Sequence, residues 1–229
     1  NTVYSSGLWI GSMDNYGNPS VSGVHWNHSD FTPGQIINNE EPLNNESLSG
    51  VWRLSPNPGA LQVGPMINSA EWWQNSQEDV ETRWCLFDDE YVFHGDGTFE
   101  NVFHGDTWVQ SWQSDSVDGD EGCFYPVYPH DNSNEAYWSV NSDNSTITVH
   151  GTGAFIGLAN VVNAGEFWNN PELDVPDSIS YEVTYFDGNT MVVSINFEIG
   201  YWTFTFEKDN SSNSLSDPYA PESRVLKVN

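Results

Sequence analysis

The sequence predicts an all-β protein with an extended N-terminal arm, built as an antiparallel, jelly-roll-like β-sandwich or as a closed β-barrel of about 8–10 strands. Asn, Ser, Gly and Thr are abundant while Lys, Ala and Leu are sparse, which favours strands and turns over helices. Short apolar and aromatic runs alternate with turn sequences from residue 46 to residue 208. The aromatic content of 14%, with 11 tryptophans, argues against the disorder that is typical of strongly acidic chains.

Residues 1–45 are expected to form the arm, which ends in a polar linker over residues 40–47. The arm carries short apolar patches between Gly, Asn, Ser and Pro residues. Each patch is long enough for one strand, but together they cannot enclose a core. The residues expected to make contacts from this arm are Leu8, Trp9, Ile10, Val24, Trp26 and Phe31.

Residues 46–208 are expected to form the β domain, which opens with the strand-like run GVWRL at residues 50–54. The clearest hairpin spans residues 180–197, where β-rich runs flank the turn Asp187-Gly188-Asn189. One short helix is expected within residues 70–80. Residues 209–229 form a polar tail in this prediction, and its last apolar run could add one edge strand.

The tetrapeptide Phe-His-Gly-Asp occurs twice, at residues 93–96 and 103–106, and two hypotheses explain it. His94 and His104 could share a metal ion, or the two copies could be ordinary turns. The hairpin register around Asp96-Gly97 places the two imidazoles at different heights, so we favour the turns. The stretch then predicts a three-stranded meander.

The charge balance excludes several classes of partner. The chain holds 33 Asp and Glu residues against 5 Lys and Arg residues, a formal net charge of −28. Such a surface repels nucleic acid and anionic lipid, so neither is expected as a partner. No run of 18 apolar residues occurs, so membrane insertion is not expected.

One acidic loop has the ligand chemistry for Ca²⁺, with carboxylates at Asp115, Asp118, Asp120 and Glu121. It lacks the order of carboxylates found in EF-hand loops. A bound Ca²⁺ and a plain solvated loop therefore both stay open, and no other cofactor is expected.

The two cysteines, Cys85 and Cys123, are expected to form a disulfide. The loop-entropy model gives such a bridge roughly 3–4 kcal/mol of stabilisation. Disulfides persist outside the reducing cytoplasm, so an extracellular or cell-surface location follows.

No catalytic motif is recognised, and the chain is not expected to be an enzyme. Asp88 and Glu90 are the best carboxylate pair available, because alternate residues of a strand share one face. The alternative is a solvated strand with one buried, hydrogen-bonded aspartate.

The tryptophans are too numerous to be all core. Trp108 and Trp112 are four residues apart and would share one face of a strand. Packing and sugar stacking are both open for each ring. The candidates for stacking on a glycan are Trp73, Trp108, Trp112 and Trp168.

Residues 48–208 resemble a β module of secreted marine Bacteroidota proteins that is often attached to laminarinase-type glycoside hydrolases. The resemblance implies an extracellular, glycan-associated setting. It is carried, among others, by Gly50-Val51-Trp52-Arg53-Leu54, Trp72-Trp73, Cys85-Leu86-Phe87-Asp88-Asp89, Asp96-Gly97-Thr98-Phe99, Trp112-Gln113 and Gly153-Ala154-Phe155-Ile156-Gly157-Leu158.

The arm is similar to a segment of Bacteroidota surface proteins that are secreted by the type IX route. The matching residues are Gly7-Leu8-Trp9-Ile10-Gly11, Asp14, Gly17 and Asp30-Phe31-Thr32-Pro33-Gly34. Ser12 and Gln35 depart from the pattern, which usually has Gly and Pro there.

Two functions follow as hypotheses. In the first, the chain is a non-catalytic structural or adhesive surface protein that assembles with copies of itself, into filaments if the arm adds a strand to a neighbour's sheet edge. In the second, it is a carbohydrate-binding module that recognises polysaccharide through exposed tryptophans. The first is favoured narrowly, because the arm has strand-like patches and no core of its own.

Overall fold

The computed structural model describes residues 12–13, 19–20, 43–113, 121–142, 145–168 and 173–210. The chain divides into two units, residues 1–39 and 40–229. In the first unit, β1 (Ser12–Met13) pairs antiparallel with β2 (Pro19–Ser20). The residues predicted to make contacts from the arm lie outside the described residues. The same holds for the tail after residue 210.

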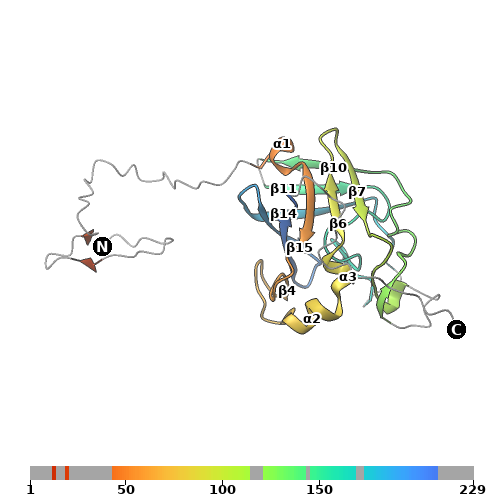
Figure 1. Ribbon diagram of the computed structural model, residues 1–229, viewed down its shortest axis with the longest axis horizontal. Helices are drawn as coiled ribbons and strands as arrows, with labels where there is room; N and C mark the ends of the chain where they lie inside the picture. The colour runs from red at the N-terminus through yellow and green to blue at the C-terminus, as the bar shows by residue number, and fades with distance from the viewer. Residues whose placement is uncertain are drawn as a thin grey trace. The chain divides into compact units, whose positions relative to one another are not determined.

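The second unit is a closed, eight-stranded antiparallel β-barrel (Figure 1). Of the two architectures that the sequence left open, the chain therefore forms the barrel. Each strand pairs with the next one around the ring, and the last strand returns to pair with the first. The eight strands are β3 (Gly50–Leu54), β6 (Glu90–Phe93), β7 (Thr98–Val102), β10 (Ala136–Asn141), β11 (Thr146–His150), β14 (Ser178–Phe186), β15 (Thr190–Asn196) and β16 (Tyr201–Lys208).

Strand β16 closes the ring by pairing with β15 on one edge and with β3 on the other, and it also pairs with β4 (Leu61–Gly64). One edge pairs along its length with β15. The other edge pairs with β3 through residues 206–208 and with β4 through residues 201–204. A further strand, β5 (Trp73–Gln74), pairs with β4, so the sheet extends beyond the barrel at one end.

Alternation of apolar and polar residues sets which side chains face the interior. Strand β14 reads SISYEVTYF, and its buried residues recur at every second position up to the bulge after Val183. The predicted hairpin between β14 and β15 is confirmed. Period-two burial is what a strand with one solvated face requires.

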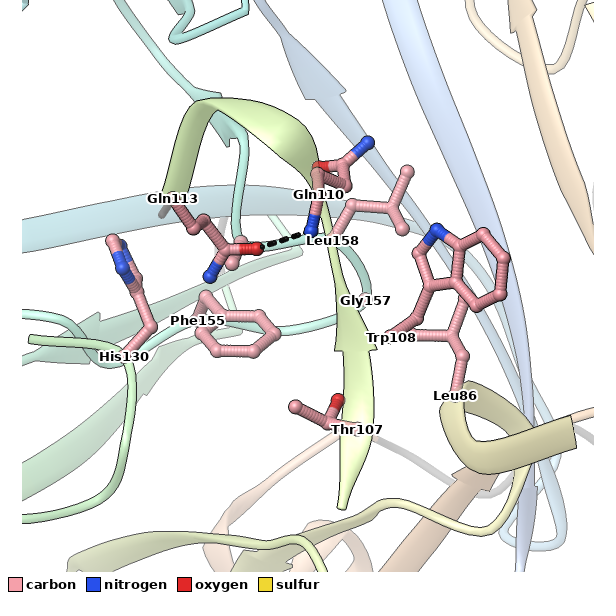
Figure 2. Close-up of a pocket in the computed structure, with 10 residues that line it drawn as sticks. Leu86, Thr107, Trp108, Gln110, Gln113, His130, Phe155, Gly157 and Leu158 are labelled. Carbon is pink, nitrogen blue, oxygen red and sulfur yellow. Dashed lines mark hydrogen bonds between the residues drawn. The ribbon is translucent and has the colours of Figure 1, made fainter. Parts of the chain in front are cut away.

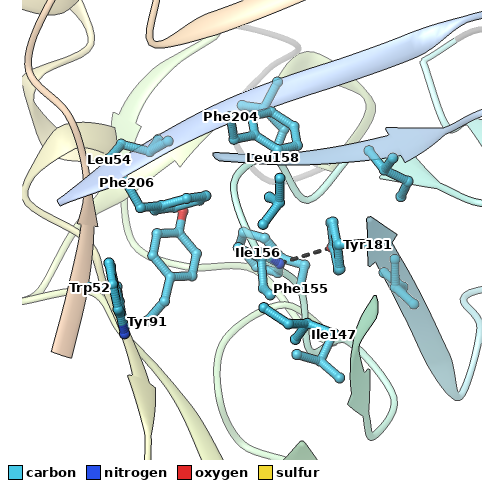
Figure 3. Close-up of a cluster of buried hydrophobic side chains, with 14 of the residues drawn as sticks. Trp52, Leu54, Tyr91, Ile147, Phe155, Ile156, Leu158, Tyr181, Phe204 and Phe206 are labelled. Carbon is cyan, nitrogen blue, oxygen red and sulfur yellow. Dashed lines mark hydrogen bonds between the residues drawn. The ribbon is translucent and has the colours of Figure 1, made fainter. Parts of the chain in front are cut away.

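The barrel interior is filled by a segment of the connection between β11 and β14, residues 153–158, which we call the plug (Figure 3). All six residues are buried. The hydroxyl of Tyr91 donates to the carbonyl oxygen of Gly157 over 2.8 Å, and the amide of Ile156 donates to the hydroxyl of Tyr181 over 2.9 Å. Because Tyr91 lies on β6 and Tyr181 on β14, the two hydrogen bonds tie the plug to different walls of the barrel.

Three short helices belong to the same unit: α1 (Asn45–Leu48), α2 (Gln77–Thr82) and α3 (Trp84–Phe87). Asn44 and Ser47 form a capping box, and Leu48 is fully buried, so the polar stretch expected as a linker ends in a helix packed on the barrel. The helix expected within residues 70–80 is α2, which begins later, after the Ser76 cap.

The predicted disulfide is confirmed: Cys85 on α3 is bonded to Cys123 on β9 (Gly122–Phe124). Strand β9 pairs with β8 (Thr107–Val109) in a separate two-stranded sheet. The predicted three-stranded meander is therefore wrong, since β8 does not pair with β7.

No helix in the described part of the chain is long and apolar enough to cross a membrane.

Replacing Gly157 by alanine should destabilise the fold strongly. Gly157 has φ +85°, and a Cβ there would lie 2.8–2.9 Å from three ring carbons of Phe204. We expect a loss of about 2–4 kcal/mol in the free energy of unfolding, from strain and overpacking together.

Gly105→Ala is the matched control, measured in the same urea titrations. Gly105 also has a positive φ, +109°, but nothing lies within 4 Å of its added Cβ. It should cost about 1 kcal/mol. Equal losses in the two variants would contradict a tightly filled barrel.

Candidate functional site

Three half-buried tryptophans and one arginine form a continuous row, which we call the aromatic belt. The guanidinium carbon of Arg83 lies 5.0 Å from the ring centroid of Trp108 and 5.8 Å from that of Trp73. The ring centroids of Trp73 and Trp202 are 6.0 Å apart, with an edge-to-face angle of 61°. The belt is thus Trp108, Arg83, Trp73 and Trp202, in order of contact.

Strand register determines the positions of two belt residues, Trp73 and Trp202. Val63 of β4 pairs with Trp202 of β16 on one side and with Trp73 of β5 on the other. Residues that pair across neighbouring strands lie on the same face of a sheet. Both indoles therefore project from one face, and Arg83 reaches them from the junction of α2 and α3.

Two of the belt indoles donate hydrogen bonds from their N–H groups to carboxylates. Trp108 donates its Nε1–H to Glu121 over 2.7 Å, and Trp202 donates its Nε1–H to Glu166 over 2.7 Å. A cation–π contact and a charge-assisted hydrogen bond each restrict a ring. The belt is therefore fixed before any ligand arrives.

Trp112 lies elsewhere than the sequence predicted. Strand β8 ends at Val109, and Trp112 belongs to a 3₁₀-helix, η2 (Ser111–Gln113), so it does not share a strand face with Trp108. The polar residues that follow Val109 turn the chain out of the strand. The ring of Trp112 stacks on Phe167 at 4.8 Å and 23°. It packs against the core, as the half-buried belt indoles of Trp73, Trp108 and Trp202 also do.

Two tryptophans beside the belt are exposed. Trp168 is 61% exposed and comes two residues after Glu166, the partner of Trp202. Trp72 is 47% exposed and precedes Trp73. Its six-membered ring occupies the space of a side chain at Gly200, so only glycine fits there.

Trp73 is among the residues predicted to stack on a glycan, whereas the exposed Trp72 is not. Alternation along a strand predicts that neighbouring residues point to opposite sides, but not which one faces the protein. The pairing of Trp73 with Val63 decides it. Met66 and Ile199, 64% and 70% exposed, add apolar surface on the turns at this end of the β4–β5 and β15–β16 hairpins.

A small hollow adjoins the belt at Trp108 (Figure 2). It has room for about one water-sized sphere, so it is too small for a sugar ring. His130 lines it, and burial lowers the pKa of this imidazole to about 4, against an opposing effect of Asp131. This hollow therefore does not hold a large ligand.

The carboxylates considered for catalysis do not form a strand pair. Asp88 ends α3 and Glu90 begins β6, so the expected strand with both on one face is wrong. Glu90 contacts Arg53 and, at 3.2 Å, the Nε2 of His104. The apolar run before Asp88 forms helix α3. A composition that favours strands did not predict this helix.

Asp89 is the buried aspartate of this stretch. It is 1% exposed, and its Oδ2 accepts from the hydroxyl of Thr107 over 2.6 Å. Burial, with the nearby charges of Asp88 and Asp106, raises the pKa of Asp89 well above its usual range, although the Thr107 hydrogen bond opposes this.

The sequence left two metal sites open, a Ca²⁺ loop at residues 115–121 and a site shared by His94 and His104. Of the proposed Ca²⁺ ligands, Glu121 alone is described, and it accepts the indole N–H of Trp108; Asp115, Asp118 and Asp120 lie outside the described residues. His94 lies 3.4 Å from Glu100 and His104 lies beside Glu90, so each imidazole faces its own carboxylate. The described ranges contain no group of three or more His, Cys, Asp or Glu side chains that could hold a metal ion.

No family model matches the chain, and no curated protein matches it. Among solved structures, a lipocalin-like protein from Bacteroides uniformis is 14% identical, with a TM-score of 0.32, over 71% of this chain and 98% of that one. An uncharacterized protein from Bacteroides eggerthii is 13% identical, with a TM-score of 0.32, over 70% of this chain and 98% of that one.

Acidification should weaken the fold through His130. Its folded pKa of about 4 is below the ordinary 6.5, so between these values the unfolded chain takes up a proton that the folded protein does not. Between pH 7.0 and pH 5.0 this linkage removes about 2 kcal/mol of stability.

His130→Gln should abolish this contribution. The free energies of unfolding of both proteins would be measured in urea at the two pH values. The wild type should lose about 2 kcal/mol more than the variant. An equal loss in both proteins would rule out His130 as the cause.

Proposed function

We propose that the protein is a non-catalytic, extracellular polysaccharide-binding module, with the aromatic belt and its exposed neighbours as the binding surface. The observation that carries the proposal is the exposure of Trp72 and Trp168, at 47% and 61%, close in the chain to Trp73 and to Glu166, the partner of Trp202. Large exposed aromatic rings are typical of a binding surface.

The belt has the properties that carbohydrate recognition needs. Its indoles offer flat apolar surface, and Arg83 and Glu121 supply hydrogen-bonding groups beside them. Fixed rings lose little conformational entropy when a ligand binds. The plug fills the barrel interior, which favours a surface site over an internal one.

Two further observations support the non-catalytic and extracellular parts of the proposal. Asp88 and Glu90 are both buried, at 4% and 6% exposure, where a polysaccharide chain does not reach them. The Cys85–Cys123 disulfide is of the kind that persists in an oxidising compartment.

Replacing either exposed tryptophan by alanine should weaken polysaccharide binding. In affinity electrophoresis with laminarin, hydroxyethyl cellulose, xylan or starch in the gel, the wild type should be retarded by at least one polysaccharide. Trp72→Ala and Trp168→Ala should each raise Kd for that polysaccharide about tenfold, because each removes one stacking surface.

The control is Tyr137→Ala. Tyr137 is 49% exposed on the barrel wall at β10, away from the belt, and its removal should leave Kd unchanged. Wild-type affinity in both tryptophan variants would reject this binding surface. A lack of retardation by every polysaccharide would reject the function.

Self-assembly is a second candidate, and one observation favours it. Strand β5 pairs with β4 on one side only, and no strand in the described ranges covers its other edge. An open edge can accept a strand from a neighbour. The expected donors, in residues 1–45, lie outside the described part of the chain.

Deleting residues 1–39 should abolish assemblies seen by negative-stain microscopy of the full chain, because the expected donor strands are removed while the Asn44 cap of α1 is kept. Unchanged assemblies after the deletion would show that strand donation is not their basis. The deletion should not affect retardation by polysaccharide if the belt alone binds it.

A further inference from the structure

We infer that the polysaccharide recognised by the aromatic belt is uncharged, and that the protein discriminates against carboxylated or sulfated glycans. This inference rests on the proposed function and names its ligand class. It follows from the placement of the few cationic side chains and from the polar groups of the belt.

The described part of the chain holds three cationic side chains, and each is engaged within the protein. Arg53 contacts Glu90 and lies 3.5 Å from Asp209. Lys208 donates to the carbonyl oxygen of Ser47 over 2.8 Å and lies 5.4 Å from the ring centroid of Trp52. Neither is placed to meet an anionic ligand at the belt.

Arg83 is the cation of the belt itself. The rings of Trp73 and Trp108 lie 5.8 Å and 5.0 Å from its guanidinium carbon. Its charge also acts on Asp79 of α2, whose pKa is lowered mainly by hydrogen bonds from Ser76 and additionally by Arg83. Arg83 is therefore already engaged with two aromatic faces.

The other polar groups of the belt are acceptors with negative charge. Glu121 and Glu166 accept the indole N–H groups of Trp108 and Trp202, so these two donors are occupied. A carboxylate accepts hydrogen bonds and cannot donate them when ionised. Glu166 is buried, at 6% exposure, whereas Glu121 is exposed. The groups of a ligand that fit beside Glu121 are donors, as sugar hydroxyls are, whereas a carboxylate or sulfate would be repelled.

The net charge of the whole molecule also disfavours the binding of anionic glycans. Its formal net charge is −28, and the field of such a surface opposes the approach of a polyanion. This repulsion is screened by salt: the Debye length falls from about 30 Å at 0.01 M to about 3 Å at 1 M. Rejection of anionic glycans should therefore depend strongly on ionic strength.

The test compares one backbone with and without charge. The neutral polysaccharide that retards the wild type is carboxymethylated, and Kd for the parent and the derivative is measured at 0.01 M and 1 M NaCl. At low salt the derivative should bind at least tenfold more weakly than its parent. At high salt the difference should shrink severalfold, while binding of the parent changes little.

Each outcome is decisive. Equal affinity for parent and derivative at low salt, or retardation by alginate but by no neutral polysaccharide, would overturn the inference and leave the binding function standing. An equal deficit at both salt concentrations would mean steric exclusion and would also overturn it. Absence of binding to every neutral and anionic polysaccharide would instead reject the proposed function.

A pair of single variants locates the discrimination. Glu121→Gln removes one exposed charge at the belt and keeps an acceptor for the indole of Trp108. Glu182→Gln removes one charge from an exposed position on the barrel wall. The Glu121 variant should narrow the ratio of the two Kd values more than the Glu182 variant, and equal effects would overturn the assignment to the belt.

Discussion

The fold depends on how the barrel interior is filled. Eight strands closed on themselves leave a space that their own side chains must occupy or that another segment must enter. Here the plug enters, and its Gly157 carbonyl and Ile156 amide are satisfied by the hydroxyls of Tyr91 and Tyr181, while Asn101 donates to the carbonyl of Phe155. A buried, unsatisfied amide or carbonyl costs about 1–3 kcal/mol, so the interior depends on these side-chain partners.

The same constraint bears on where a large ligand can bind. With the interior occupied, large ligands are left with the ends and the outer surface of the barrel. The aromatic belt lies where the sheet extends past the barrel through β4 and β5. The disulfide from α3 to β9 supports the opposite end of the belt, since β9 pairs with the strand that carries Trp108.

Local features of the fold were predictable from the sequence, and long-range ones were not. Alternation and turn residues predict the hairpin of β14 and β15 because both depend on neighbours in the chain. Closure of the barrel depends on β16 pairing with β3, about 150 residues earlier, and no local pattern records that. The candidate site divides in the same way: tryptophan content indicates a stacking surface, but Trp72 and Trp73 are distinguished only by cross-strand register, and Trp112 by the turn after β8.

The pairing of Val63 with both Trp73 and Trp202 has a consequence for how the site can vary. The two rings are carried by strands on either side of a third, so their backbones are separated by two strand spacings of about 4.8 Å each. Substitutions in loops therefore leave this distance unchanged, and a register slip of one residue would turn an indole to the opposite face. The spacing of the two rings is thus fixed by the strand pairing of the barrel sheet. Substitutions can change the residues around the rings far more readily than the distance between the rings.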